Sequence, residues 1–110
     1  MAIIAIESGY DHTAVSPCHG VGYMQVRSTI WEGHNPYNIH DRYENIIAGT
    51  WILRQYANEL GSVEAAIPAY NVGIEKVKAG RSIGAQKRYI RKVNETLRRI
   101  RRHPRELDTL

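Results

Sequence analysis

The segment DRYENIIAGTWILRQYANELG, residues 41–61, carries the strongest periodic pattern in the chain. Asp41 followed by Glu44 resembles a helix capping box, in which two side chains satisfy backbone groups at a helix start. Residues suited to one helix face then recur every three or four positions, at Ile46, Thr50, Leu53, Ala57 and Leu60. Gly61 stands where a glycine commonly ends a helix. The segment therefore predicts a long helix with these five residues along one side.

Shorter signals on both sides of this segment predict more helices. Residues 2–8 have the character of the closing turns of a helix that Gly9 ends. Ser62 can cap a following helix, which Pro68 should kink because its ring removes a backbone donor. A last helix is predicted by its basic end and by the spacing of Tyr89, Ile90, Val93, Leu97 and Ile100.

The residues between the first two predicted helices differ in kind. Residues 9–41 are rich in Gly, Pro, Asn, Asp and His, which predicts a long ordered loop with a short hairpin near GVGYMQV, residues 20–26. Loops of that length in a small domain usually have a function. We therefore expect a mainly α fold, a single compact helical domain over residues 1–110 with at most a small β-hairpin.

The charges are unevenly distributed along the chain. Residues 1–75 have a net charge of −5 and residues 76–110 one of +9, within a total of +4. A basic helix and tail over about residues 83–110 favours a polyanionic neighbour, namely nucleic acid, an anionic membrane face or an acidic wall polymer. A solvated helix face is the plainer explanation of the same pattern. No apolar run is long enough to span a membrane, and no signal peptide is evident.

Metal and disulfide chemistry are not indicated. The five histidines show no HExxH or other ligand spacing, so no metal site is expected. Cys18 is the sole cysteine of the chain and cannot form an internal disulfide.

Glu7 is the carboxylate with the most suggestive position. It falls in the last turn of the first predicted helix, whose dipole disfavours a further negative charge, and Ile3 and Ile4 lie one turn earlier. Both effects are expected to raise the pKa of Glu7. A glutamic acid that keeps its proton near neutral pH can protonate the leaving oxygen in glycoside cleavage. Taken alone, a solvent-facing glutamate at a helix end explains the same pattern.

Five short motifs occur in the order and at about the spacing of soluble lytic transglycosylase (SLT) domains: ES (7–8), AVSP (14–17), GVGYMQ (20–25), NIIAG (45–49) and AYNVG (69–73). Over residues 2 to about 93 the chain resembles this family of the lysozyme-like superfamily. The resemblance implies a mostly helical lyase that cuts peptidoglycan between N-acetylmuramic acid and N-acetylglucosamine. It also implies no cofactor, glycan strands as the partner, no nucleic acid, and a monomer or part of a larger assembly.

The resemblance further implies a role for each matching residue. Glu7 matches the family's sole catalytic acid/base, and Tyr70 matches a catalytic tyrosine whose hydroxyl points at that glutamate. The residues expected to bind substrate are Ser16, Tyr23, Met24, Gln25 and Asn71, and those expected to support the site are Ser8, Gly22 and Asn45. Structural explanations stand beside these roles: Met24 as core, Tyr70 as a buried tyrosine, and Ser16 and Gln25 as loop hydrogen-bonding residues.

A single carboxylate suffices for the reaction that the resemblance implies. Most glycosidases need two carboxylates. Here the C6 hydroxyl of the muramic acid attacks C1 and leaves a 1,6-anhydro sugar, and a tethered hydroxyl has a high effective concentration. A hydrolytic lysozyme stays possible if Asp11, Asp41 or Glu44 activates water across a cleft. A nucleic-acid-binding module that uses residues 83–105 and a non-catalytic wall-binding protein are rival functions from different classes.

The chain departs from the family pattern at several positions. The family has a full helix before its ES pair, whereas this chain starts six residues before Glu7, so we expect a fragment or a minimal version. SPCHG (16–20) replaces Ser-Pro-x-Gly-Ala, and GYMQ replaces the commoner GLMQ. Ala85 and Gln86 stand where an acidic residue and a threonine are common. We expect action at the cell wall, in the periplasm, outside the cell or as a phage-encoded lysis or virion enzyme.

Overall fold

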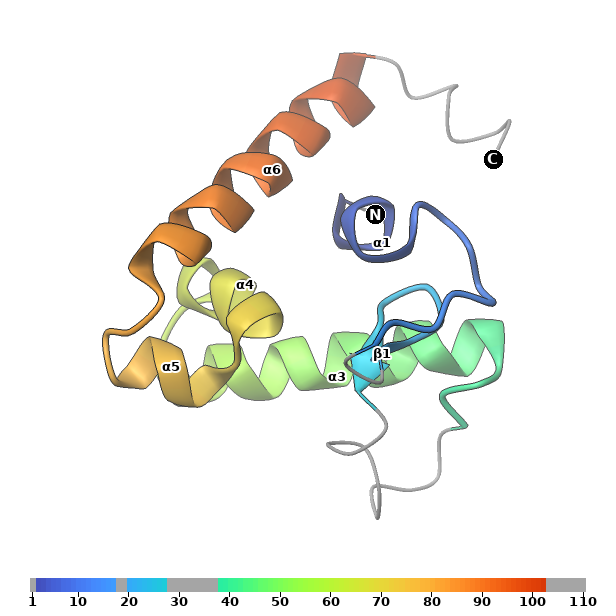
Figure 1. The fold of residues 1–110 in the computed structure, drawn as a ribbon, viewed down its shortest axis with the longest axis horizontal. Helices are drawn as coiled ribbons and strands as arrows, with labels where there is room; N and C mark the ends of the chain where they lie inside the picture. The colour runs from blue at the N-terminus through green and yellow to red at the C-terminus, as the bar shows by residue number, and fades with distance from the viewer. Residues whose placement is uncertain (1, 18–19, 28–37, 103–110) are drawn as a thin grey trace. The chain divides into compact units, whose positions relative to one another are not determined.

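The computed structural model describes residues 2–17, 20–27 and 38–102, and these residues are mainly helical (Figure 1). The helices are α1 (Ala2–Ser8), α3 (Arg42–Leu60), α4 (Val63–Val72), α5 (Ile74–Lys78) and α6 (Ile83–Arg102). Strands β1 (Gly20–Val21) and β2 (Val26–Arg27) pair as one antiparallel hairpin. The predicted mainly α fold with a small hairpin is confirmed. Within the described ranges, no helix is long and apolar enough to span a membrane.

The contacts of the chain divide into two compact units. The first unit contains residues 1–50 and 96–110, and the second contains residues 51–95. Helices α3 and α6 each contribute residues to both units. A single domain over residues 1–110 stays a prediction.

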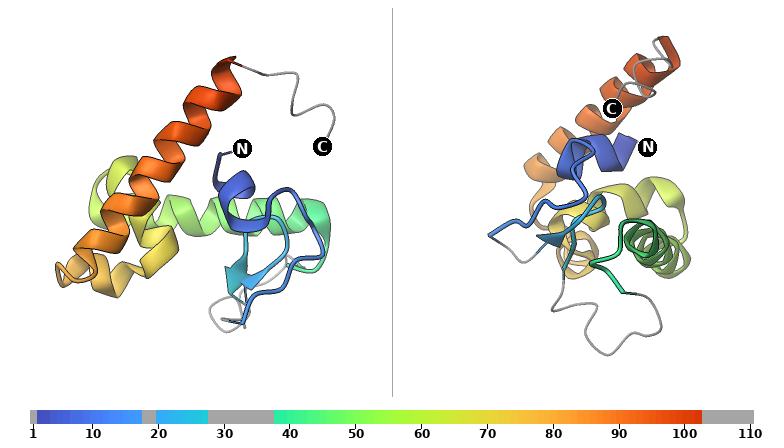
Figure 2. Two further views of the ribbon diagram at one scale, coloured as in Figure 1. Left: turned by 45° about the horizontal axis from the view of Figure 1, so that its top comes forward. Right: turned by 90° about the vertical axis from the view of Figure 1, so that its right-hand side faces the viewer.

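The first unit contains α1, the hairpin and the first half of α3 (Figure 2). In the hairpin Gly20 pairs with Arg27 and Val21 with Val26, and Val15 forms an isolated bridge to Val21. The apolar residues buried in this unit include Val21, Met24, Val26, Ile39 and Ala48. Because most of these residues flank the hairpin, the unit's core lies where the hairpin meets α3.

Helix α3 begins as the sequence predicts, with one difference at its cap. One carboxylate oxygen of Asp41 accepts hydrogen bonds from the backbone N–H groups of Tyr43 (3.0 Å) and Glu44 (2.8 Å). These bonds satisfy two of the N–H groups that a helix start leaves without partners. The N–H of Asp41 donates to the carbonyl oxygen of Asn38 at 3.1 Å, so the second half of the predicted capping box is replaced by a turn.

The buried face of α3 differs from the predicted one. Its buried residues are Asn45, Ala48, Gly49 and Ile52, whereas Thr50 is exposed. Periodicity missed this face because Asn45 and Gly49 do not count as apolar. Both residues are buried because the hairpin packs directly on them.

The second unit is built on the end of α3, α4 and α5. The Ser62 hydroxyl caps α4 by accepting a hydrogen bond from the N–H of Ala65 at 3.1 Å, as predicted. Pro68 is buried inside α4, and the kink expected there stays a prediction. Lys78 of α5 pairs with Glu59 of α3, which raises the pKa of the Lys78 ammonium. The five-residue α5 was not predicted, because so short a helix leaves almost no periodic signal.

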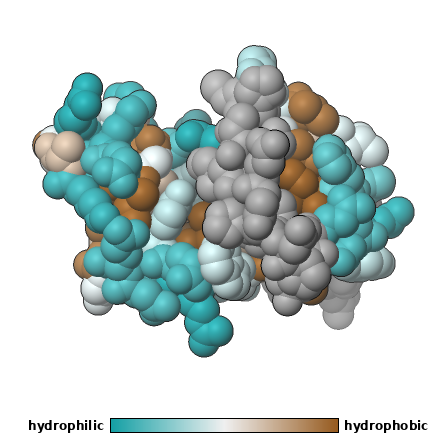
Figure 3. Space-filling view, turned by 90° about the horizontal axis from the view of Figure 1, so that it is seen from below, coloured by the Kyte–Doolittle hydropathy of each residue, from teal (hydrophilic) through white to brown (hydrophobic). Residues whose placement is uncertain are grey.

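Helix α6 confirms the predicted basic last helix. Tyr89 and Val93 are buried along one side, whereas Ile90 is exposed. Arg99, Arg101 and Arg102 occupy its last turn, where the helix dipole favours positive charge. Figure 3 shows one face of the whole molecule, on which hydrophobic residues lie between hydrophilic ones, as is usual for protein surfaces.

Candidate active site

Glu7 lies in the last turn of α1 and is partly buried. The hydroxyl of Ser8 donates to the carbonyl oxygen of Ile4 at 3.1 Å, and the N–H of Gly9 donates to that of Ala5 at 3.0 Å. These bonds fix the turn that carries Glu7, and Ile4 beneath it is buried. Ser8 therefore supports the local backbone of the predicted catalytic residue.

The backbone leaves α1 through a left-handed pair of residues. Gly9 has φ +59°, and Tyr10 has φ +65°, which is uncommon for a residue with a side chain. Burial raises the pKa of the Tyr10 phenol, and the positive charge of Arg99 opposes this shift. Backbone conformations of this kind persist where the surroundings hold them and are frequent near functional sites.

Ser16 and Gly20 close the loop that precedes the hairpin. The Ser16 hydroxyl accepts a hydrogen bond from the N–H of Gly20 at 2.9 Å, and the Ser16 N–H donates to the Gly20 carbonyl oxygen at 2.9 Å. The hydroxyl proton of Ser16 can still donate to a ligand, because these bonds use only its acceptor capacity. Cys18 and His19 of the same loop, like residues 28–37, lie outside the described residues.

Gln25 fastens the hairpin turn with its side chain. Its amide nitrogen donates to the carbonyl oxygens of Ala14 (3.0 Å) and Gly22 (2.9 Å). Its backbone has φ +50°, a second uncommon left-handed conformation in this unit. The loop-supporting role considered for Gln25 is therefore observed, and contact with substrate stays a prediction.

Asn45 attaches the hairpin to α3. Its fully buried side-chain nitrogen donates to the carbonyl oxygens of Val21 (2.7 Å) and Ile39 (2.8 Å). Its side-chain oxygen accepts from the N–H of Met24 at 2.9 Å. Because three buried backbone groups depend on one amide, Asn45 sets the position of the hairpin on the helix.

Gly22 and Gly49 provide the space for this attachment. A β-carbon on Gly22, which has φ +74°, would lie 2.6 Å from the side-chain nitrogen of Asn45. A β-carbon on Gly49 would lie 2.6 Å from the sulfur of Met24. Glycine is thus required at both positions for close packing of the hairpin on α3. Met24 is only 5% exposed, so the packing role considered for it is observed, and its contact with glycan stays a prediction.

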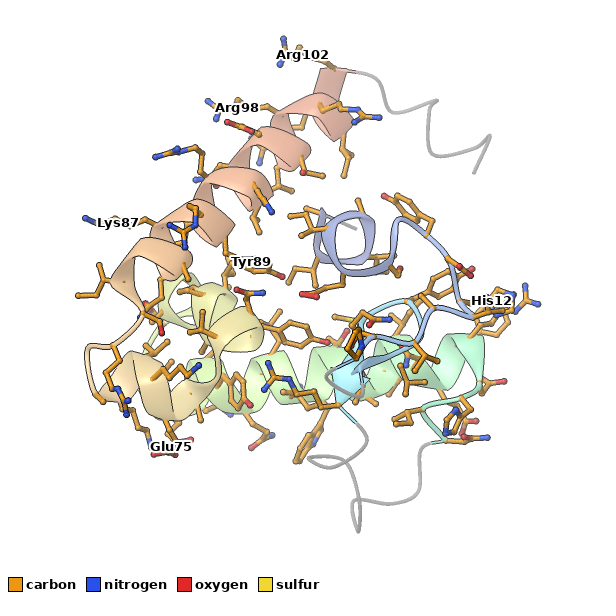
Figure 4. The ribbon with its side chains drawn as sticks, in the orientation of Figure 1. His12, Glu75, Lys87, Tyr89, Arg98 and Arg102 are labelled. Carbon is orange, nitrogen blue, oxygen red and sulfur yellow. The ribbon has the colours of Figure 1, made fainter. Side chains whose placement is uncertain are left out.

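Tyr23 and His12 form an aromatic pair at the edge of the hairpin. Their rings meet edge to face with centroids 5.9 Å apart, and both residues are partly buried. His12 is labelled in Figure 4, where its side chain projects from the loop that follows α1. Tyr23 thus has an aromatic neighbour that fixes its ring.

The remaining predicted site residues belong to the second unit. Tyr70 and Asn71 lie in the last turn of α4 and are partly buried. Gly73 ends this helix by donating its N–H to the carbonyl oxygen of Ala69 at 2.9 Å. Gln86, beside Ala85 at the start of α6, donates its side-chain amide to the carbonyl oxygen of Arg81 at 2.7 Å and so supports the turn before that helix.

The SLT transglycosylase domain family matches residues 1–93 of the chain. The chain belongs to this family. No solved structure matches it. Membership in the SLT family indicates that the substrate belongs to the peptidoglycan class and that the reaction is glycan cleavage. Every site residue predicted from the sequence lies inside the match, whereas α6 continues beyond it to Arg102.

Two of the three carboxylates considered for hydrolysis in this SLT-family chain have local roles. Asp11 accepts hydrogen bonds from the N–H (2.9 Å) and the hydroxyl (2.6 Å) of Thr13, which lower the pKa of its carboxyl group. Asp41 caps α3. The lowered pKa makes Asp11 a weaker base, and the hydrogen bonds of Asp41 commit one of its carboxylate oxygens to the helix start, so neither is a good candidate for the general base of hydrolysis.

Sequence reasoning missed Tyr10 and underrated Asn45 in the SLT-family site. The left-handed conformation of Tyr10 had no sequence signal, since tyrosine rarely adopts it. A polar residue between the apolar positions of a predicted helix could have drawn attention to Asn45. Over the residues that the structure describes, no group of three His, Cys, Asp or Glu side chains is placed to hold a metal ion.

Proposed function

We propose that the protein is a peptidoglycan lytic transglycosylase in which Glu7 is the single acid/base. Glu7 first protonates the oxygen of the bond between N-acetylmuramic acid and N-acetylglucosamine. The resulting carboxylate then accepts the proton of the muramic acid's C6 hydroxyl as that oxygen bonds to C1. The products are a free glycan end and a 1,6-anhydro end, and no water is consumed. No cofactor takes part.

The position of Glu7 within the family match supports this proposal most directly. The carboxylate stands in a partly buried helix turn whose backbone is fixed by Ser8 and Gly9. A fixed, partly desolvated carboxyl group suits proton donation to a leaving oxygen. The engagement of Asp11 and Asp41 with local backbone groups favours a one-carboxylate reaction over hydrolysis.

The other predicted residues take supporting roles in the proposal. Ser16 and Gln25 orient the substrate's acetamido group and adjoining sugar or peptide from the loop and hairpin. Tyr23 contacts sugar with its ring or hydroxyl, and Asn71 is a further binding residue. Tyr70 directs its hydroxyl at the catalytic carboxyl. We propose the cell wall as the place of action, in the periplasm, outside the cell or during phage lysis or entry.

The decisive experiment compares Glu7→Gln with the parent chain on purified sacculi. Because general acid/base catalysis contributes about 10²- to 10⁴-fold, the variant should release muropeptides at least about 100-fold more slowly. Glu75→Gln is the matched control, because Glu75 is an exposed glutamate on α5 and its loss should leave the rate unchanged (Figure 4). Equal rates for Glu7→Gln and the parent would refute the catalytic assignment.

Mass analysis of the released muropeptides separates the transglycosylase from a lysozyme. The proposal predicts 1,6-anhydro ends, which lack one water relative to ordinary reducing ends and resist borohydride reduction. Free reducing ends would instead show hydrolysis. Tyr70→Phe should slow release while leaving the anhydro product unchanged, because it removes one hydroxyl and no carboxylate.

A further inference from the structure

Helix α6 carries a dense set of exposed positive charges. Six arginines and two lysines lie between Ile83 and Arg102, and Glu95 is the sole acidic residue among them. All eight cationic side chains are exposed. Figure 4 shows Lys87, Arg98 and Arg102 projecting outward from the helix. Four of the eight, Arg98, Arg99, Arg101 and Arg102, follow the end of the family match at residue 93.

The helical repeat arranges these charges in rows. Lys87, Arg91, Arg98 and Arg102 are separated by four, seven and four residues and so fall along one stripe, here called the cationic stripe. At 1.5 Å per residue the stripe is about 22 Å long. Arg88, Lys92 and Arg99 form a shorter second row beside it. Rows of this kind match a repeating polyanion better than a single anionic ligand.

Four cations repel one another along the cationic stripe, and Glu95, four residues after Arg91 and three before Arg98, is the single acidic residue of α6 that offsets them. Like charges four residues apart repel, as at Lys87 with Arg91 and at Arg98 with Arg102, by about 0.2–0.5 kcal/mol per pair. The dipole favours cations only near the helix end, so it does not favour Lys87 or Arg91 in the first half, although Arg91 has Glu95 four residues later. In the described part of the chain, none of the four stripe residues makes a salt bridge.

The apolar side of α6 is already covered by the protein. Tyr89 and Val93 are 4% and 3% exposed, so the helix has few apolar residues to insert into a lipid bilayer. Ile83 and Ile90 are 54% and 38% exposed, but eight exposed cations dominate the accessible surface of α6, so a partner would be recognised mainly by charge. Arginine, the more frequent cation here, pairs well with planar carboxylates through two parallel hydrogen bonds.

We propose that the cationic stripe binds the carboxylates of peptidoglycan stem peptides and holds the enzyme on the polymer it cleaves. The choice of partner rests on the proposed function, because the substrate strand itself repeats carboxylate-bearing peptides along its length. The main part of the chain, with a net charge of −5 over residues 1–75, would be repelled by such a polymer. The stripe offsets this repulsion with residues other than those proposed for catalysis.

The test measures binding of the full chain to sacculi at low temperature in the Glu7→Gln background, by co-sedimentation. The stripe variant carries Lys87→Gln, Arg91→Gln, Arg98→Gln and Arg102→Gln. The control variant replaces four exposed cations outside α6 by Gln: Arg42, Arg54, Lys76 and Arg81. Glu7→Gln raises the formal net charge from +4 to +5, and both variants lower it from +5 to +1, so they differ only in where charge is removed.

The stripe variant should bind sacculi about tenfold more weakly, since each of four exposed ion pairs contributes modestly. The control variant should change binding less than about threefold, because it removes no contact with the wall. Sacculi whose carboxyl groups have been converted to amides should bind the parent as weakly as ordinary sacculi bind the stripe variant. Circular dichroism checks that α6 stays helical in the stripe variant, which removes repulsion and should not unfold it.

Several results would overturn the proposal. Equal losses in both variants would mean that only net charge matters, and unchanged binding to amidated sacculi would exclude carboxylates. Tighter binding of the parent to duplex DNA or to vesicles of anionic phospholipid than to sacculi, at equal salt, would assign the stripe to those partners. Failure of the proposed function is separate, because it would appear as absent anhydro products while stripe-dependent binding persisted.

Discussion

Asn45 is the residue on which the local structure of the first unit most depends. Replacing it by alanine removes three buried hydrogen bonds, from its amide to the carbonyl oxygens of Val21 and Ile39 and to its oxygen from the N–H of Met24. Each unsatisfied buried group costs about 1–3 kcal/mol, so Asn45→Ala should lower the free energy of unfolding by about 3 kcal/mol or more. Urea denaturation of the purified variant measures the change.

Asn58→Ala is the matched control for that measurement. Asn58 is exposed on the same helix, and alanine is the better helix former, so its replacement should change stability by less than about 0.5 kcal/mol. A loss below about 1 kcal/mol for Asn45→Ala would mean that the hairpin is held to α3 by other contacts.

Asp11 should titrate below its usual pKa of 3.8, because Thr13 donates two hydrogen bonds to its ionised form. A carboxyl group whose pKa is lowered by folding stabilises the folded state fully above pH 3.8. That contribution is lost as the pH falls through the lower folded value. Carboxyl NMR titration should give a lower pKa for Asp11 in the parent than in Thr13→Ala, and identical values would contradict this assignment.

At the residue scale, the sequence predicted where a residue lies in a helix better than which atoms its side chain contacts. Glu7 was predicted in the last turn of a helix and is found there, because glycine at position 9 is a local signal for the helix end. The side-chain bonds of Gln25 to Ala14 and Gly22 could not be predicted, because they depend on the path of a loop. The burial of Met24 agrees with the core role that the sequence offered beside glycan contact.

At the scale of elements, the packing of the hairpin on α3 depends on Gly49. In Gly49→Ala the new β-carbon would lie 2.6 Å from the sulfur and 2.7 Å from the β-carbon of Met24. Overpacking costs about 1–3 kcal/mol, and the better helix propensity of alanine returns about 1 kcal/mol. We therefore expect a net loss of up to about 2 kcal/mol in thermal or urea unfolding.

Gly84→Ala is the control for Gly49→Ala, because α6 has space for a β-carbon at position 84. A β-carbon on Gly84 would meet only the end of the flexible Arg88 side chain, at 3.3 Å. Because only helix propensity then counts, this variant should gain about 0.5–1 kcal/mol. If Gly49→Ala were also stabilising, Met24 would have room to move and the close packing would not be essential.

Helices with strong end signals were predicted well. Asp41, Ser62 and Gly61 act as the sequence suggests, and the amphipathic pattern of α6 places Tyr89 and Val93 on its buried side. The buried face of α3 was not predicted, since it is chosen by the hairpin that packs there. Tertiary contacts of that kind override a weak local pattern.

At the scale of the whole molecule, residues 1–75 carry a net charge of −5 and residues 76–110 one of +9. Because of this distribution, we expect added salt to weaken binding to the wall without lowering the stability of the fold. Raising NaCl from about 0.05 M to about 0.5 M shortens the screening length from over 10 Å to below 5 Å. Binding to sacculi should weaken at least about tenfold, because the cationic stripe is screened from carboxylates. The melting temperature should hold or rise, because the same salt screens repulsion along α6.

Parallel measurements by co-sedimentation and calorimetry check this prediction on one preparation. The stripe variant is the internal comparison, since it should lose most of the salt response in both measurements. Binding that is insensitive to salt would show that contacts other than ion pairs hold the protein on the wall.

The close packing of the Met24 side chain against Gly49 has a consequence for oxidative damage. A sulfur atom with so little accessible surface reacts with peroxide only when the hairpin lifts from the helix, so the rate of sulfoxide formation reports how often that opening occurs. Once oxidised, the bulkier and more polar side chain would no longer fit beside the glycine. A brief exposure to peroxide would then be recorded as a lasting local rearrangement, until a reductase restored the thioether.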